Sequence, residues 1–87
     1  MKYLARMLYM PWREEFHSQV VDVVAGKVRA VSPFKEELHS MILVDEVYIT
    51  SIDSAIAVYD IKIEIHRTGG SLYAYSANEA GVLTRLL

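Results

Sequence analysis

Two neighbouring segments of the chain change the phase of their hydrophobic alternation at matching positions, and acidic residues lie at both changes. In Met41–Thr50 the branched apolar residues occupy even positions before Asp45 and odd positions after Glu46. In residues 55–66 the same change, from even to odd positions, falls across Tyr59-Asp60. Successive side chains of a strand point to opposite faces. The pattern therefore indicates two strands that each change the face they bury.

Folding these two segments about residues 51–54 brings the two changes of phase together. Thr50 then faces Ala55, and each branched residue of one segment meets a branched residue of the other. In this register Asp45 lies opposite Asp60. A bulge in one strand alone would shift the register. The pairing therefore predicts a long, bent hairpin whose two halves bury opposite faces.

The acidic residues at the bend leave two interpretations open. In the first, the bend turns Asp45 and Asp60 into water, where salt screens their repulsion. In the second, Asp45, Glu46 and Asp60 form a metal site, because carboxylate oxygens suit hard cations such as Ca²⁺ and Mg²⁺. Adjacent strand residues point to opposite faces, so only two of the three carboxylates converge. The sequence favours a bend and keeps the metal site as the alternative.

The rest of the chain predicts further short strands separated by turn residues. These strands are expected at residues 2–10, 16–24, 27–31, 72–76 and 82–86. A helix is the competing interpretation of the first segment, and a helical turn capped by Asn78 competes with the last. Residues 32–38 predict a short helical turn, with Ser32 as its cap and Pro33 at its first position.

One short hairpin has a clear turn signal. Ala25-Gly26 between residues 16–24 and 27–31 can form a two-residue loop with a positive φ at the glycine. That loop pairs Val24 with Lys27, and it places Asp22 opposite Arg29. A second loop, at residues 67–71, contains Gly69-Gly70. An odd number of residues in that loop, with a glycine bulge, would put tyrosines of the following strand beside isoleucines of the preceding one.

The succession of predicted hairpins favours one fold class. We expect a single all-β domain, an antiparallel sheet of about six or seven strands folded into a small barrel or sandwich, with at most one short helical turn.

Composition limits the partners and the chemistry. Hydrophobic residues make up 53% of the 87 residues, above the usual ~45–50%, which predicts a homodimer or another protein partner. A net charge of -2 leaves no basic surplus for nucleic acid. No signal peptide and no apolar stretch of ~18 residues is evident, which predicts a cytoplasmic protein that does not contact membranes. No cofactor motif and no catalytic constellation appears: the chain has no Cys, and its histidines lack metal-ligand spacing.

The stretch from Val20 to Pro33 resembles a hairpin in the small N-terminal β-domain of amidohydrolase-like enzymes. Gly26, Lys27, Val28 and Pro33 match that pattern, whereas Ala25 and Ser32 replace its usual Asp and Gly. The resemblance implies a β-fold with this hairpin. It implies no hydrolase activity, because the family's catalytic barrel and its His-x-His motif are absent from the sequence. More generally, the chain is similar to small β proteins common in bacterial genomes.

These observations predict a non-enzymatic interaction or assembly module that acts as an oligomer. The alternative is a small metal- or ligand-binding β domain, or an accessory fragment of a hydrolase, with its acidic site at Asp45, Glu46 and Asp60.

Overall fold

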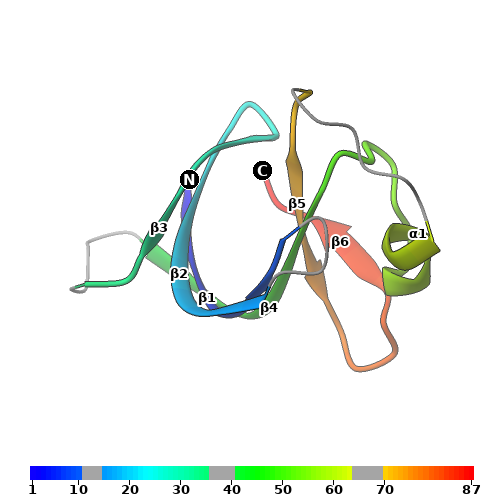
Figure 1. The fold of residues 1–87 in the computed structure, drawn as a ribbon, viewed down its shortest axis with the longest axis horizontal. Helices are drawn as coiled ribbons and strands as arrows, with labels where there is room; N and C mark the ends of the chain where they lie inside the picture. Colours follow the sequence, from blue (N-terminus) through cyan, green and yellow to red (C-terminus); the bar gives the residue numbers. More distant parts are fainter. Residues whose placement is uncertain (11–14, 36–40, 64–69) are drawn as a thin grey trace.

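One of the two central strands of the sheet is β1 (Lys2–Tyr9), which pairs with β2 (Glu15–Val24) on one side and with β4 (Met41–Thr50) on the other. The computed structural model describes residues 1–10, 15–35, 41–63 and 70–87. Within these residues, six strands form one sheet in the order β3-β2-β1-β4-β5-β6 (Figure 1). The remaining elements are β3 (Lys27–Pro33), α1 (Val58–Ile63), β5 (Tyr73–Ala77) and β6 (Leu83–Arg85). The predicted all-β class with one short helical element is confirmed.

The sheet is mixed rather than wholly antiparallel. β1 and β4 run parallel, from the pair Lys2–Met41 to the pair Tyr9–Tyr48, whereas all the other neighbouring strands are antiparallel. The chain leaves the β2–β3 hairpin and returns on the far side of β1, so β1 has a hydrogen-bonded neighbour along both edges. A sequence interpretation built on hairpins alone cannot predict this pairing.

The long hairpin predicted between residues 41–50 and 55–66 is wrong. β4 pairs with β1 and β5, and the segment after residue 57 begins with the helix α1. The branched residues of that segment fit a helix as well as a strand, because Val58 and Ile61 are three positions apart. Ile61 is buried beside Tyr75 and Leu83, and Val58 packs against the same cluster. Helical spacing therefore decides the local structure here.

The change of phase within β4 is real, but both halves of the strand face the same core. Val44 packs against the cluster that contains Val47, so the step between inward side chains is three residues. β1 takes the same step between Ala5 and Leu8, and the β1–β4 register stays constant across it. Ser18 of β2, beside this step, has a φ of 50°. The predicted switch of buried face is thus wrong, because an irregularity shared by neighbouring strands keeps the core on one side.

The turn of the β2–β3 hairpin is the one that the sequence predicts. Ala25 and Gly26 have φ values of 54° and 76°, the two left-handed residues of a tight hairpin turn. Val24 pairs with Lys27, as expected.

Beyond the turn, the hairpin register departs from the prediction. It shifts between Asp22 and Val23, so Asp22 lies opposite Ala30 rather than Arg29. Arg29 Nε still lies 3.6 Å from Asp22 Oδ2, so the predicted pair of opposite charges forms across the shift.

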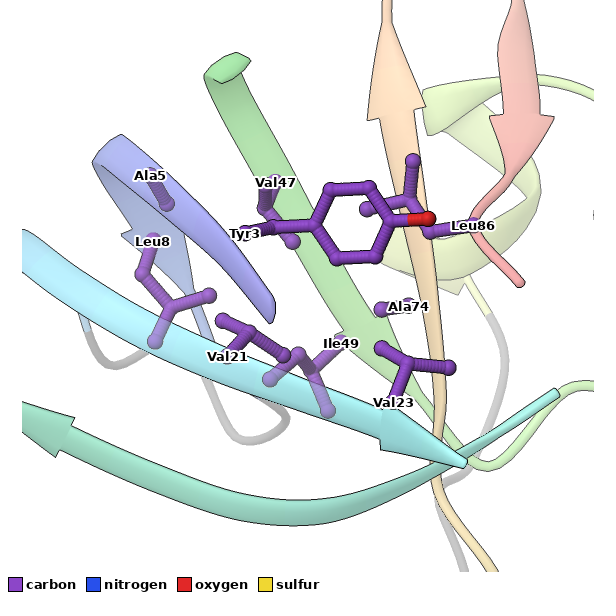
Figure 2. Packing of buried hydrophobic residues seen from close by; sticks show 9 residues of the cluster. All are labelled: Tyr3, Ala5, Leu8, Val21, Val23, Val47, Ile49, Ala74 and Leu86. Carbon is purple, nitrogen blue, oxygen red and sulfur yellow. The ribbon is translucent and has the colours of Figure 1, made fainter. Parts of the chain in front are cut away.

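The main core lies inside the curl of the sheet (Figure 1, Figure 2). Its buried side chains come from four strands and from the C-terminal residues: Tyr3, Ala5, Leu8, Val21, Val23, Val47, Ile49, Ala74 and Leu86. The curl brings the beginning of β3 to the residue before β5, where Val28 N donates a hydrogen bond of 2.8 Å to Leu72 O. Tyr3 Oη reaches across the core and donates to Leu87 O at 2.8 Å.

A second, smaller core lies on the other face of β5. Ala74 belongs to the main core, whereas its neighbour Tyr75 is buried with Ile61 of α1 and Leu83 of β6. Opposite faces of one strand thus serve two clusters. β6 is a strand, as the sequence favoured, and it pairs with β5 from Tyr75–Arg85 onward.

The remaining predictions have mixed outcomes. Ser32 and Pro33 belong to β3 and do not begin a helical turn, because they continue the β2–β3 ladder opposite Val20 and Gln19. Residues 36–38 of that predicted turn, and residues 67–69 of the glycine loop, lie outside the described residues. No helix in the described ranges is long and apolar enough to cross a membrane.

Candidate functional site

The three acidic residues of the predicted metal site make separate contacts. Asp45 lies on β4 and its carboxylate forms an ion pair with Arg6 Nε of β1. This hydrogen bond and the positive charge of Arg6 lower the pKa of Asp45. Both side chains are largely exposed, so the pair is a surface ion pair, whose attraction water and salt screen.

Asp60 has a structural task at the start of α1. Its Oδ2 accepts hydrogen bonds from the backbone N–H groups of Ala57 at 2.9 Å and Ile56 at 3.2 Å. A carboxylate in the first turn that reaches back to the residue before the helix satisfies otherwise unpaired donors there. The register that would have placed Asp60 opposite Asp45 does not occur.

Glu46 is next to Asp45 in β4, and it pairs in register with Met7 rather than with an acidic residue. Its charge helps to raise the pKa of Tyr9 and Tyr48, although burial is the larger cause for each. The two tyrosine rings stack, with centroids 4.5 Å apart. Across the described part of the chain, no group of three or more His, Cys, Asp or Glu side chains could hold a metal ion. The geometry on which the predicted metal site depended is therefore absent.

The side of β1 and β4 that points away from the main core carries a different combination of groups. Ala5 and Val44 face the core, so Leu4 and Leu43, their neighbours, point outward. Leu4 and Leu43 are register partners in adjacent strands, and Leu43 is 77% exposed. They form the apolar centre of what we call the β1–β4 outer face.

A pair of opposite charges borders this apolar centre. Arg6 and Asp45 follow Leu4 and Leu43 two positions further along the same strands. Their side chains are 61% and 71% exposed. The β1–β4 outer face, defined by Leu4, Arg6, Leu43 and Asp45, thus joins a half-buried leucine, Leu4, and an exposed one, Leu43, to one positive and one negative group. Such an arrangement can bind a protein surface of matching shape and charge.

A second constellation, around Arg85 of β6, holds the fold together. Its guanidinium forms an ion pair with the Asp53 carboxylate and donates a hydrogen bond of 3.2 Å to the Asp53 carbonyl. It also donates to Gly26 O at 2.9 Å and lies 4.5 Å from the ring centre of Tyr73. These contacts join the β2–β3 turn, the loop after β4 and the last strand. We assign this cluster to structure.

Tyr75 also holds the loop after β4 in place by hydrogen bonds. Its hydroxyl donates to Ile52 O at 2.7 Å and accepts from Ala55 N at 3.4 Å. Burial raises the pKa of this tyrosine, which keeps the hydroxyl protonated and able to donate.

Comparison of the chain with protein-family models, with curated proteins and with solved structures finds no match. The resemblance of Val20–Pro33 to an amidohydrolase hairpin therefore stays a prediction. The fold and the side chains described above carry the functional argument.

Sequence patterns missed Arg6, Leu43 and Arg85. A signal for Arg6 existed, because Leu4 and Arg6 alternate with the buried Tyr3 and Ala5. The exposure of Leu43 could not be predicted, because it depends on which face of β4 packs against the core. The contacts of Arg85 with Gly26 and Asp53 span 59 and 32 residues of sequence, and no local pattern indicates them.

Proposed function

We propose that this chain is a non-enzymatic protein-interaction module that acts as a homodimer or within a larger assembly. The observation that carries the proposal is Leu43, which is 77% exposed on the part of β4 that pairs with β1 alone, since β5 pairs with β4 only from Val47 to Thr50. A sheet normally buries its apolar side chains against a second layer. Contiguous exposed apolar patches mark interaction sites on small proteins.

The distribution of apolar residues supports the same proposal. Besides Leu43, the exposed large hydrophobic side chains include Phe16, Val24, Ile42, Ile56, Tyr59, Val82 and Leu87. Full burial of one such side chain contributes about 1.5–3 kcal/mol. Association costs about 4–15 kcal/mol in lost translational and rotational freedom. Covering a few of these side chains with a partner is therefore enough to offset that cost.

Two finer features belong to the proposal. We infer that the curled sheet is a partly closed barrel rather than a sandwich, a shape supported by the hydrogen bond from Val28 to Leu72. A cytoplasmic location is the second feature, and its support is the sequence pattern alone.

Native mass spectrometry and light scattering over a dilution series, from about 100 µM to about 1 µM, test the proposal. We expect a species of twice the chain mass at the high end that dissociates on dilution. The same spectra report any retained metal or small molecule. A chain that remains monomeric over the whole series contradicts the homodimer, and a retained ligand would favour a binding domain instead.

A further inference from the structure

We propose that the β1–β4 outer face is the surface on which a second copy of this chain docks, with a two-fold axis parallel to the strands and midway between β1 and β4. This inference rests on the proposed homodimer and names its contact surface. The partner is a second copy because the face is complementary to itself.

The charges on this face carry the argument. Arg6 and Asp45 lie side by side on adjacent strands, at the same level of the sheet. In a two-fold dimer the same patch serves both copies, so that residue i meets residue j and j meets i. Rotation about an axis along the strands exchanges the positions of β1 and β4. Each Arg6 is thereby placed over the Asp45 of the other copy, and each Asp45 over the other copy's Arg6.

The same rotation also matches the apolar side chains. Leu4 and Leu43 are partners in the same register, so the operation sets Leu4 of one copy against Leu43 of the other. An axis across the strands would instead oppose Arg6 to Lys2, which also points outward from β1 and is exposed. Like charges placed opposite each other are unfavourable. The charges therefore select one orientation of the two copies.

The area that an interface needs indicates its extent. A standard interface buries about 800 Å² on each partner, against an accessible surface of 5836 Å² for the whole chain. Two leucine side chains alone do not supply that area. The contact therefore includes the Arg6–Asp45 pair and extends beyond these four side chains to further residues of β1 and β4.

Leu43→Glu tests the apolar centre, and Ile56→Glu is its matched control. Ile56 is 72% exposed, lies before α1 and accepts a backbone hydrogen bond from Leu83 of β6. We expect Leu43→Glu to weaken dimerisation at least about 100-fold, because each dimer loses two buried leucines. Ile56→Glu leaves the dissociation constant unchanged, and circular dichroism confirms that both variants are folded. If the wild type is a dimer and only Ile56→Glu weakens it, this face is wrong while the proposed function stands.

Mixing two charge-reversal variants tests the orientation. In the Arg6→Glu homodimer, the new carboxylate of each copy faces Asp45 of the other, so both intermolecular pairs carry like charges. In the Asp45→Arg homodimer, the new guanidinium faces Arg6 of the other copy in the same way. We therefore expect each variant alone to dissociate more readily. Combining the two variants restores an opposite charge at both intermolecular positions. Native mass spectrometry distinguishes the mixed dimer by mass, and we expect it to exceed either homodimer at least about tenfold. A statistical mixture of the three dimers overturns the proposed orientation, and a monomeric wild type overturns the homodimer itself.

Discussion

Arg85 and Gly26 lie 59 residues apart in the sequence, and Arg85 Nη2 donates a hydrogen bond of 2.9 Å to the carbonyl oxygen of Gly26. The contact ties the tip of the β2–β3 hairpin to β6, the strand at the far end of the sheet order. The Arg85 side chain therefore links the two ends of a six-stranded sheet, and we expect it to contribute strongly to the stability of the fold.

Replacing Arg85 with Ala should lower the free energy of unfolding by about 1.5–3 kcal/mol. The hydrogen bond to Gly26 involves a charged donor, and such bonds are worth about that much; the contact with the ring of Tyr73 is lost as well. Arg29→Ala is the control, because its ion pair with Asp22 is 70% exposed on the arginine side and is worth about 0–1 kcal/mol. Urea denaturation measures both. Equal losses in the two variants would contradict the structural role of Arg85.

Substituting Ala for each of two glycines with the same backbone φ distinguishes the cost of a side-chain contact from the cost of backbone strain. Gly26 and Gly81 both have a φ of 76°, where a side chain costs about 1–2 kcal/mol. A Cβ at Gly26 would lie 3.1 Å from Arg85 Nη2, whereas one at Gly81 would meet only Val58 Cγ2, at 4.0 Å. We expect Gly26→Ala to destabilise more than Gly81→Ala.

In an Arg85→Ala background, the difference between the two glycine variants should shrink toward zero. Thermal denaturation of the four variants completes this double-mutant cycle. A difference that persists without Arg85 would show that the hairpin turn itself, and not the guanidinium, resists a side chain at position 26.

Asp60→Ala should destabilise the fold by about 0.5–2 kcal/mol, the range for losing a helix cap. The carboxylate accepts from the N–H groups of Ile56 and Ala57, and its removal leaves both donors at the start of α1 without that acceptor. Asp45→Ala is the control, since it removes an exposed carboxylate from a strand, and both variants are compared in dilute solution, where loss of the proposed dimer contact at Asp45 does not contribute. Adding Ca²⁺ or Mg²⁺, or a chelator, should leave the melting temperature of the wild type unchanged. A rise in melting temperature with the metal, lost in both variants, would restore the metal site predicted from the sequence.

The Arg6–Asp45 pair leads to a prediction of how the stability of the fold depends on pH. Arg6 lowers the pKa of Asp45 below its ordinary value of 3.8. A carboxyl group whose pKa is lower in the folded state stabilises the fold above the unfolded pKa, and this contribution is lost as pH falls through the folded value. Carbon-detected NMR titration should place Asp45 below 3.8 in the wild type and nearer that value in Arg6→Ala. An unchanged titration in the variant would show that Arg6 is not the cause.

Local sequence signals predicted those parts of the fold that depend on neighbouring residues. The Ala25-Gly26 turn and the Val24–Lys27 pair follow from turn chemistry, which acts over a few residues. The partner of β4 could not be predicted in this way. Its parallel pairing with β1 joins positions 39 residues apart, as in Arg6 and Asp45, and no turn residue marks it.

The register expected between Asp45 and Asp60 does not occur, and the reason is related. Alternation alone does not distinguish a strand from a helix in a short apolar segment. The residues around Asp60 satisfied both patterns, and packing of Ile61 against Tyr75 and Leu83 favoured the helix. The change of phase at Asp45 and Glu46 was observed correctly, but it was matched to the wrong strand. Its true match is the step from Ala5 to Leu8 in β1.

The parallel pairing of β1 with β4 has a consequence for folding kinetics. β1 is the middle of the sheet, yet one of its two edges stays open until residues 41–50 arrive. Loop-closure entropy must be overcome before such a non-local pairing stabilises anything, and chains rich in these contacts fold in milliseconds to seconds. We expect the β1–β2–β3 meander to form early as an incomplete sheet. Docking of β4 is then the step that sets the folding rate, and until it occurs the exposed edge of β1 is the point at which aggregation begins.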